Sequence, residues 1–422
     1  MSQFEYQNGV MHAEGVALTA IAEQYGTPAY VYSKKTLLDN FDSYANAAAG
    51  RDALVCYAMK ANSNLAILKL LADRGAGFDI VSGGELLRVV AAGGDAKKVI
   101  FSGVGKSVDE MRLALTHDIL CFNVESIPEL HRLNEVAAGM GKKARVSLRV
   151  NPNVDAKTHP YIATGLKANK FGVAFSDALD TYRVASKLPA LDVVGIDCHI
   201  GSQLLDDAPL LEALDKLIEL IDTLHAEGIH LHHLDIGGGL GIDYGDGAPV
   251  PVGDYLGRLF KRIDAWRAAK HGGQPIKVIF EPGRSIVGNA GVLLTRVEFI
   301  KHGEEKNFCI VDAAMNDMAR PAMYQAWMDM QPVVQAGAGS AMFDVVGPIC
   351  ESGDWLARDR ELAVEPGDLL VMKTAGAYGM TMASNYNTRG RAVELVVDGA
   401  QVHVVRQREN PADLFALEST IK

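Results

Sequence analysis

The sequence lacks the features that mark secreted, membrane-spanning and nucleic-acid-binding proteins. It has 5 cysteines in 422 residues, an odd number without a C-x-x-C pair, so neither a disulfide framework nor a zinc cluster is predicted. No apolar run is long enough to cross a bilayer, and the start has no signal-peptide pattern. Acidic residues outnumber Lys and Arg by 52 to 41, and no dense basic run occurs. We therefore expect a cytoplasmic protein with reduced thiols and no nucleic-acid or membrane partner.

What is present is the composition of an ordinary globular protein, with 48% hydrophobic and 22% charged residues. From about residue 54 to 284 one pattern repeats, in which a short β-branched run and a turn precede apolar residues at helical spacing. The predicted strands are residues 55–59, 78–81, 99–102, 121–124, 145–150, 193–199, 233–237 and 278–282. Eight such units predict an α/β fold with a parallel (β/α)8 TIM barrel, and a doubly wound open sheet is the alternative.

The pattern changes towards the end of the chain. After Gly291, strand-like runs follow one another, separated by Gly, Pro and Asp turns. We therefore predict a barrel domain over residues 29–284 and a mostly β domain over residues 285–422. Within the barrel, three helices are expected to begin with a Ser-x-x-Glu capping box, at Ser82, Ser107 and Ser126.

Reactive side chains follow several predicted strands at the end where barrels of this kind carry their active sites. Lys60 follows the first strand, Asp79 lies in the second, His199 ends the sixth and Glu281 lies in the eighth. Each alone is a weak signal, because a lysine after a strand is usually solvated and a lone histidine is usually structural. Their common position at one rim favours an active site.

The run Gly237, Gly238 and Gly239 after the seventh strand suggests a phosphate site, since glycines before a helix let backbone N–H groups approach an anion. No Walker-type motif or early G-x-G-x-x-G follows a strand, so a nucleotide is disfavoured. A rim lysine, a phosphate site and a nearby carboxylate are what pyridoxal 5'-phosphate requires. We expect this cofactor and no metal, because the histidines, among them His232 and His233, lack the spacing of metal ligands.

Nine motifs, taken in order, resemble the fold-type III pyridoxal-phosphate decarboxylases, and among them the enzymes that act on meso-diaminopimelate. The motifs are YAMKAN, FDIVSGGEL, TGLKANKFG, CHIGSQ, DIGGGLGI, EPGRSIV, RPAMY, CESGD and GAYG. The resemblance covers nearly the whole chain. It implies an alanine-racemase-like barrel, a β domain that residues 1–28 join, and a homodimer whose subunits share each active site.

The resemblance also assigns roles around the cofactor. Lys60 would form the Schiff base, His199 would stack on the ring, and Glu281 would pair with the pyridine nitrogen. A carboxylate there keeps the nitrogen protonated and the ring a strong electron sink, which favours decarboxylation over racemisation. Asp79 either contacts the cofactor or supports its neighbours. The full set expected at the cofactor is Lys60, Asp79, His199, Ser202, Gly237, Gly238, Gly239, Glu281, Gly283, Arg284 and Tyr378.

Meso-2,6-diaminopimelate has an amino-carboxylate at both ends, so its far end presents both charges. The resemblance places Arg284, Arg320 and Tyr324 at the far carboxylate and Glu351 at the far ammonium, with Tyr378 also at the substrate. Guanidinium groups suit carboxylates because they bind them through two parallel hydrogen bonds. A decarboxylase of ornithine or lysine would need only an acid at this end.

The expected reaction is decarboxylation of meso-2,6-diaminopimelate to L-lysine and CO₂, the last step of lysine biosynthesis. Cys350, reaching the site from the other subunit, would donate the proton; the alternative is that it is one more small buried residue. A decarboxylase of another basic amino acid, an amino-acid racemase and a non-catalytic homologue that binds the cofactor remain alternatives. One departure is Gln325 after RPAMY, where the family more often continues with Gly-Ala.

Overall fold

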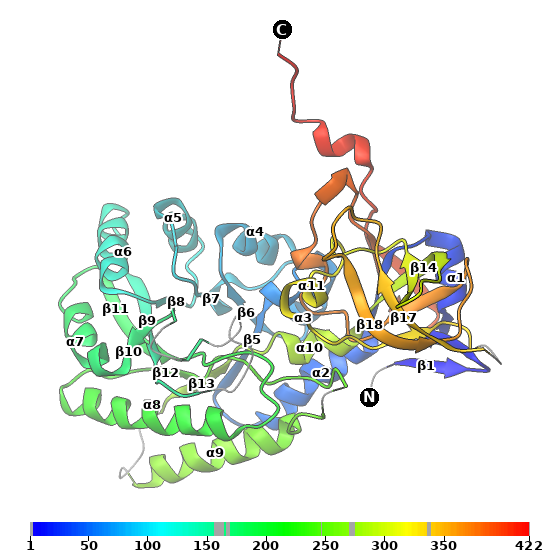
Figure 1. Ribbon diagram of the computed structural model, residues 1–422. Helices are drawn as coiled ribbons and strands as arrows, with labels where there is room; N and C mark the ends of the chain where they lie inside the picture. Colours follow the sequence, from blue (N-terminus) through cyan, green and yellow to red (C-terminus); the bar gives the residue numbers. More distant parts are fainter. Residues whose placement is uncertain are drawn as a thin grey trace. The chain divides into compact units, whose positions relative to one another are not determined.

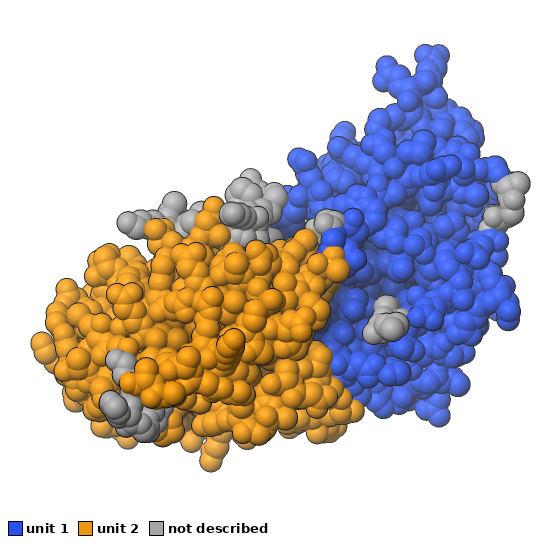
Figure 2. Space-filling view, turned by 90° about the horizontal axis from the view of Figure 1, so that it is seen from below, with its two compact units in different colours: residues 1–40, 243–247, 284–422 blue, residues 41–242, 248–283 orange. Residues whose placement is uncertain are grey.

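A computed structural model describes residues 3–155, 164–165, 169–245, 247–269, 275–335 and 339–421. The chain forms two compact units, which Figure 2 colours separately. Unit 1 consists of Met1–Asn40, Asp243–Gly247 and Arg284–Lys422, and unit 2 of Phe41–Ile242 and Ala248–Gly283. The TGLKANKFG motif lies only partly within the described residues.

Over its described residues, unit 2 is a closed parallel barrel of eight strands (Figure 1). The strands are β5 (Ala53–Ala58), β6 (Gly77–Ile80), β7 (Val99–Phe101), β8 (Cys121–Val124), β9 (Ala144–Asn151), β11 (Leu191–Asp197), β12 (His233–Asp235) and β13 (Lys277–Phe280), and the short β10 (Val173–Ala174) adds to β9. Each barrel strand pairs in parallel with the next, and β13 pairs with β5. The predicted TIM barrel is confirmed, and the doubly wound alternative is wrong.

Helices alternate with these strands. They are α2 (Lys34–Ala47), α3 (Leu65–Asp73), α4 (Gly83–Ala91), α5 (Val108–Thr116), α6 (Ile127–Gly139), α7 (Phe175–Ala185), α8 (Ala208–Ala226) and α9 (Val252–Ala269), with short 3₁₀ turns η1 (Met59–Ala61) and η2 (Ala96–Lys98). Each predicted serine cap accepts the N–H of the glutamate three residues later. Only Ser107 and Glu110 form the full reciprocal box, because Glu85 and Glu129 bind the N–H one residue before the cap. No helix in the described part of the chain is long and apolar enough to cross a membrane.

Unit 1 is built on a sheet with the strand order β18-β17-β15-β14-β4-β20-β21, and β19 pairs with both β14 and β16. The strands are β4 (Ala29–Ser33), β14 (Gly291–Lys301), β15 (Asn307–Val311), β16 (Met330–Pro332), β17 (Ala341–Val346), β18 (Trp355–Leu362), β19 (Leu369–Met372), β20 (Val393–Asp398) and β21 (Gln401–Arg406). Its helices are α1 (Leu18–Tyr25), α10 (Arg284–Val287) and α11 (Arg320–Tyr324), with 3₁₀ turns η3 (Gly288–Ala290), η4 (Met380–Met382), η5 (Tyr386–Thr388) and η6 (Pro411–Phe415). The mostly β character predicted for the end of the chain is confirmed.

The strand β4 does not belong to the barrel, although the barrel domain was predicted to start at residue 29. It pairs antiparallel with β14 and parallel with β20, inside the sheet of unit 1. All five residues of β4 are buried. A strand covered on both faces has the same continuous apolar run as a barrel strand, so the sequence pattern does not distinguish the two.

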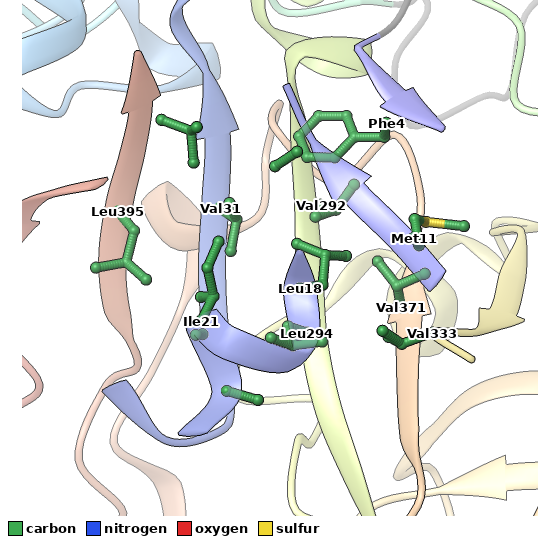
Figure 3. Close-up of a cluster of buried hydrophobic side chains, with 14 of the residues drawn as sticks. Phe4, Met11, Leu18, Ile21, Val31, Val292, Leu294, Val333, Val371 and Leu395 are labelled. Atoms are coloured by element: carbon green, nitrogen blue, oxygen red, sulfur yellow. The ribbon is translucent and has the colours of Figure 1, made fainter. Parts of the chain in front are cut away.

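The first residues pack onto the same sheet. The hairpin strands β1 (Phe4–Gln7), β2 (Val10–Ala13) and β3 (Val16–Ala17) precede α1, and Phe4, Met11 and Leu18 lie in one buried cluster with Val292 and Leu294 of β14 (Figure 3). Burial of this apolar surface stabilises the start of the chain on unit 1.

Gln325 ends α11 in the left-handed region, with φ 52°. Glycine adopts this conformation without a Cβ clash, whereas other residues are strained there. Gln325 therefore leaves local strain in the turn that ends α11.

Candidate active site

Lys60 lies in η1, directly after β5, at the carboxyl end of the barrel. Its Nζ is 2.7 Å from Oδ2 of Asp79 on β6. The Asp79 side chain is fully buried, whereas that of Lys60 is 33% exposed. The carboxylate therefore fixes the direction of an amine that remains partly exposed.

His199 follows β11 and is tied to the glycine turn after β12. Its Nδ1 lies 3.2 Å from the N–H of Gly238, which donates to it. Loss of solvent and the positive charges of Lys60 and Arg149 hold the pKa of His199 well below its usual value. The imidazole is therefore neutral, since a protonated Nδ1 has no lone pair to accept this hydrogen bond.

The three glycines after β12 pack too closely for any side chain. A Cβ at Gly237, Gly238 or Gly239 would lie 2.3, 2.1 or 2.5 Å from a backbone oxygen, and φ is +67° at Gly237 and +108° at Gly239. The expected helix does not follow directly, since α9 begins only at Val252. The intervening residues LGIDYGDGAPVP carry several Gly and Pro residues, which disfavour helix. The prediction of a helix N-terminus behind the glycines is therefore wrong.

Three carboxyl groups converge beside this turn. Asp197 ends β11, Asp235 ends β12 and Glu281 follows β13, and one oxygen of each lies within 4.8 Å of the others. Oδ1 of Asp197, Oδ2 of Asp235 and Oε1 of Glu281 have no hydrogen-bond donor among the residues described. Ionised carboxylates only accept hydrogen bonds, so a buried group of this kind retains protons.

Burial raises the pKa of all three groups, and the neighbouring carboxylates raise it further. The pKa of Asp235 rises to about 7, and those of Asp197 and Glu281 lie well above their usual values. The sequence interpretation identified Glu281 but missed Asp197 and Asp235. Their only signal was an acidic residue inside an otherwise apolar strand. Oxygens at this spacing also suit a cation, and the absence of a metal stays a prediction.

The groups of unit 2 fit pyridoxal phosphate. An accessible amine, a neutral imidazole and a side-chain-free turn lie at one rim, and Oε1 of Glu281 is buried without a donor within the described ranges. A protonated ring nitrogen supplies the donor that this oxygen lacks. Gly283 belongs to the same rim, since a Cβ there would lie 2.8 Å from the backbone oxygen of Ala58. Ser202 is half-buried in the segment after β11.

In the cofactor-free protein, Asp235 is expected to contribute stability that is lost as pH rises from about 4 to about 7. A carboxyl whose pKa is about 3.9 unfolded and raised when folded binds more protons in the folded state, so stability is lost as pH rises through the folded value, about 7 for Asp235. Each retained proton contributes a slope of about 1.4 kcal/mol per pH unit. The lowered pKa values of His233, about 4, and of His199 have the opposite effect below about pH 6.5, so the contribution of Asp235 is the difference in slope between the unmodified protein and Asp235→Asn.

Urea unfolding midpoints at several pH values measure this slope. Asp235→Asn should flatten it, whereas Asp192→Asn, which changes an exposed residue at the other end of the barrel strands, should leave it unchanged. An equally steep slope in Asp235→Asn would show that Asp235 holds no proton in this pH range.

A second group of predicted residues lies within unit 1. Arg284 and Arg320 are only 6% and 7% exposed. Nη1 of Arg284 donates to the hydroxyl of Tyr244 at 2.8 Å, and its Cζ lies 4.7 Å from the ring centroid of Tyr378. Cζ of Arg320 lies 4.4 Å from the ring centroid of Tyr244. Tyr324 is half-buried in α11. The structure thus brings two buried cations together among tyrosines.

This group suits an anion. Burial and the charge of Arg284 lower the pKa of Arg320, and in the described residues Arg320 forms no ion pair with a carboxylate. A bound carboxylate would offset the repulsion between the guanidinium groups. Tyr378 has φ 55°, a conformation that costs energy for a bulky residue and is concentrated at functional sites. The sequence interpretation missed Tyr244, whose only signal was its place after the glycine turn.

Cys350 and Glu351 lie in the turn between β17 and β18, and both are exposed. The buried carboxylate of Asp354 accepts the N–H of Ile349 at 2.7 Å, and Oδ1 of Asn387 accepts that of Cys350 at 3.2 Å. The turn is therefore held while its side chains face outward. The other four cysteines are buried, so the alternative that Cys350 is one more buried residue is wrong.

Comparison with known proteins agrees with this geometry. The family model described as pyridoxal-dependent decarboxylase, pyridoxal binding domain, matches residues 35–288. The diaminopimelate decarboxylase of Pseudomonas aeruginosa is 57% identical over 421 residues, covering 100% of both chains. The chain belongs to the family of pyridoxal-dependent decarboxylases.

Within this family, solved structures of diaminopimelate decarboxylases have the same fold. The M. jannaschii enzyme in complex with L-lysine superposes with a TM-score of 0.94 at 39% identity, covering 99% of this chain and 98% of that one. The Helicobacter pylori enzyme complexed with L-lysine has a TM-score of 0.90 at 42% identity, covering 95% and 99%.

Proposed function

We propose that the chain decarboxylates meso-2,6-diaminopimelate to L-lysine and CO₂ with pyridoxal phosphate as its cofactor. The observation that carries this proposal is the buried Oε1 of Glu281, which lacks a donor within the described parts of the chain and lies at the same rim as Lys60 and His199. A carboxylate at that position favours a protonated ring nitrogen. Relatives and solved neighbours that are diaminopimelate decarboxylases support the choice of reaction.

The residues of unit 2 provide cofactor binding and control of charge. Bound pyridoxal phosphate supplies the electron sink that accepts the electron pair left by departing CO₂. Lys60 would hold the cofactor through its amine, which Asp79 orients. His199 would cover one face of the ring, and Glu281 would favour a proton on the ring nitrogen. The glycine turn and Ser202 would hold the phosphate.

The residues of unit 1 provide substrate recognition. Arg284, Arg320 and Tyr324 bind the carboxylate at the end of the substrate that does not react, and Glu351 binds the ammonium there. Cys350 donates the proton that replaces CO₂. We propose that Cys350 and Glu351 act in the site of a second subunit of a homodimer, which their exposure in the single chain supports. The five free cysteines support a cytoplasmic location.

Release of CO₂ by the purified protein tests the proposed reaction. With pyridoxal phosphate, turnover of meso-diaminopimelate should exceed that of L-lysine, ornithine and arginine by at least about two orders of magnitude, because these substrates lack the second carboxylate and leave the two buried arginines without a partner. Faster release from one of the others would identify a different decarboxylase. Racemisation without release would identify a racemase, and no reaction with any substrate would favour a binding protein.

A further inference from the structure

The segment Asp243–Gly247 lies between two stretches of unit 2 but belongs to unit 1. Its turn is tight, because the N–H of Gly245 donates to Oδ1 of Asp243 at 2.7 Å. Gly245 has φ +110°, and a Cβ there would lie 2.5 Å from a ring carbon of Trp327. Only glycine therefore allows this approach, and the turn fixes Tyr244 in a position where it is 6% exposed.

Tyr244 contacts both buried arginines through different parts of its side chain. Its hydroxyl accepts the hydrogen bond from Nη1 of Arg284 at 2.8 Å, while its ring lies against Arg320, 4.4 Å from Cζ to the ring centroid. A hydroxyl oxygen and a π face both attract cations. One side chain therefore compensates two like charges that repel each other and sets the distance between them.

We propose that Tyr244 is a positioning residue that holds Arg284 and Arg320 as a single site for the carboxylate that the substrate keeps and the product L-lysine still carries. This inference rests on the proposed function, since it assigns the two arginines to that carboxylate. Tyr244 acts through the guanidinium groups, and it therefore governs carboxylate recognition and leaves the chemistry at the cofactor unchanged.

Paired ligands test this role in the holoenzyme. L-Lysine and 1,5-diaminopentane differ by the carboxylate alone. Tyr244→Phe keeps the ring and removes the acceptor of Arg284, so it should weaken L-lysine binding about tenfold. Tyr244→Leu also removes the ring face and should weaken it about a hundredfold. Binding of 1,5-diaminopentane should change by less than about twofold in both.

Kinetics and a matched control separate positioning from a general loss of structure. KM for meso-diaminopimelate should rise in parallel with the loss of L-lysine affinity, with kcat changed less than about threefold. Tyr386→Phe, which alters a tyrosine of unit 1 that is 47% exposed, should leave both ligands unaffected. If Tyr244→Leu does not fold, the conservative Tyr244→Phe decides alone.

Each outcome supports or overturns the proposal. A selective loss of L-lysine binding supports it, and equal loss of both ligands overturns it in favour of a structural role. If the preference for L-lysine survives both substitutions, Tyr244 has no positioning role although the proposed function stands. If the unmodified holoenzyme does not prefer L-lysine over 1,5-diaminopentane, both the inference and the assignment of the arginines fail.

Discussion

Replacement of Lys60 by alanine should abolish covalent attachment of pyridoxal phosphate and reduce turnover by at least about a thousandfold. The cofactor would lose its attachment point, because Lys60 is the only amine in the described part of unit 2 that forms an ion pair with Asp79 at this rim. The barrel should persist, since β5 is held by parallel pairing with β6 and β13 and by the burial of its own side chains, such as that of Tyr57. Borohydride reduction followed by peptide mapping measures the attachment.

Lys69→Ala is the matched control. Lys69 is an exposed lysine on α3 that forms an ion pair with Asp73, so its loss should leave both the label on Lys60 and the turnover unchanged. Label recovered on another lysine of the unmodified protein would overturn the assignment of Lys60. Circular dichroism of Lys60→Ala separates loss of the amine from loss of the fold.

Replacement of Cys350 by alanine should lower kcat by roughly a hundredfold to ten-thousandfold, the usual contribution of a positioned general acid. Cofactor affinity should change by less than about twofold, because the exposed Cys350 side chain is not required to build the rim of the barrel. Titration of the cofactor-free protein with pyridoxal phosphate and steady-state kinetics measure the two effects. Equal loss of affinity and turnover would indicate a structural role.

Mixing experiments determine which subunit supplies Cys350. If each site combines Lys60 of one subunit with Cys350 of the other, random exchange of Lys60→Ala and Cys350→Ala chains makes half of the dimers mixed, each with one intact site. The mixture should then recover about a quarter of the unmodified activity. Persistent inactivity after verified exchange would contradict the shared site.

Sequence periodicity alone was sufficient to predict the barrel. Alternation of β-branched runs with helical spacing is a local property, and the predicted strands correspond to β5 to β9 and β11 to β13. The positions of Lys60, His199 and Glu281 at the ends of β5, β11 and β13 also predicted that they would share one rim, because parallel strands align their carboxyl ends. Family motifs then supplied the chemistry that these positions suggest.

Features that depend on distant partners were not predictable in this way. β4 has the pattern of a barrel strand but pairs with β14 and β20, which lie hundreds of residues away in sequence. The helix expected behind the glycine turn is missing because the residues after it favour turns. A local pattern specifies the kind of element that forms and leaves its partner undetermined.

By itself, the sequence determined the barrel, the mostly β unit and which residues follow the barrel strands, since these follow from spacing along the chain, and its motifs indicated the cofactor chemistry. Only the tertiary structure decided that Asp197 and Asp235 join Glu281 in one buried cluster, and that Tyr244 lies between Arg284 and Arg320. Burial and proximity decide how such groups hold protons and charge, and both arise only when segments far apart in the sequence meet.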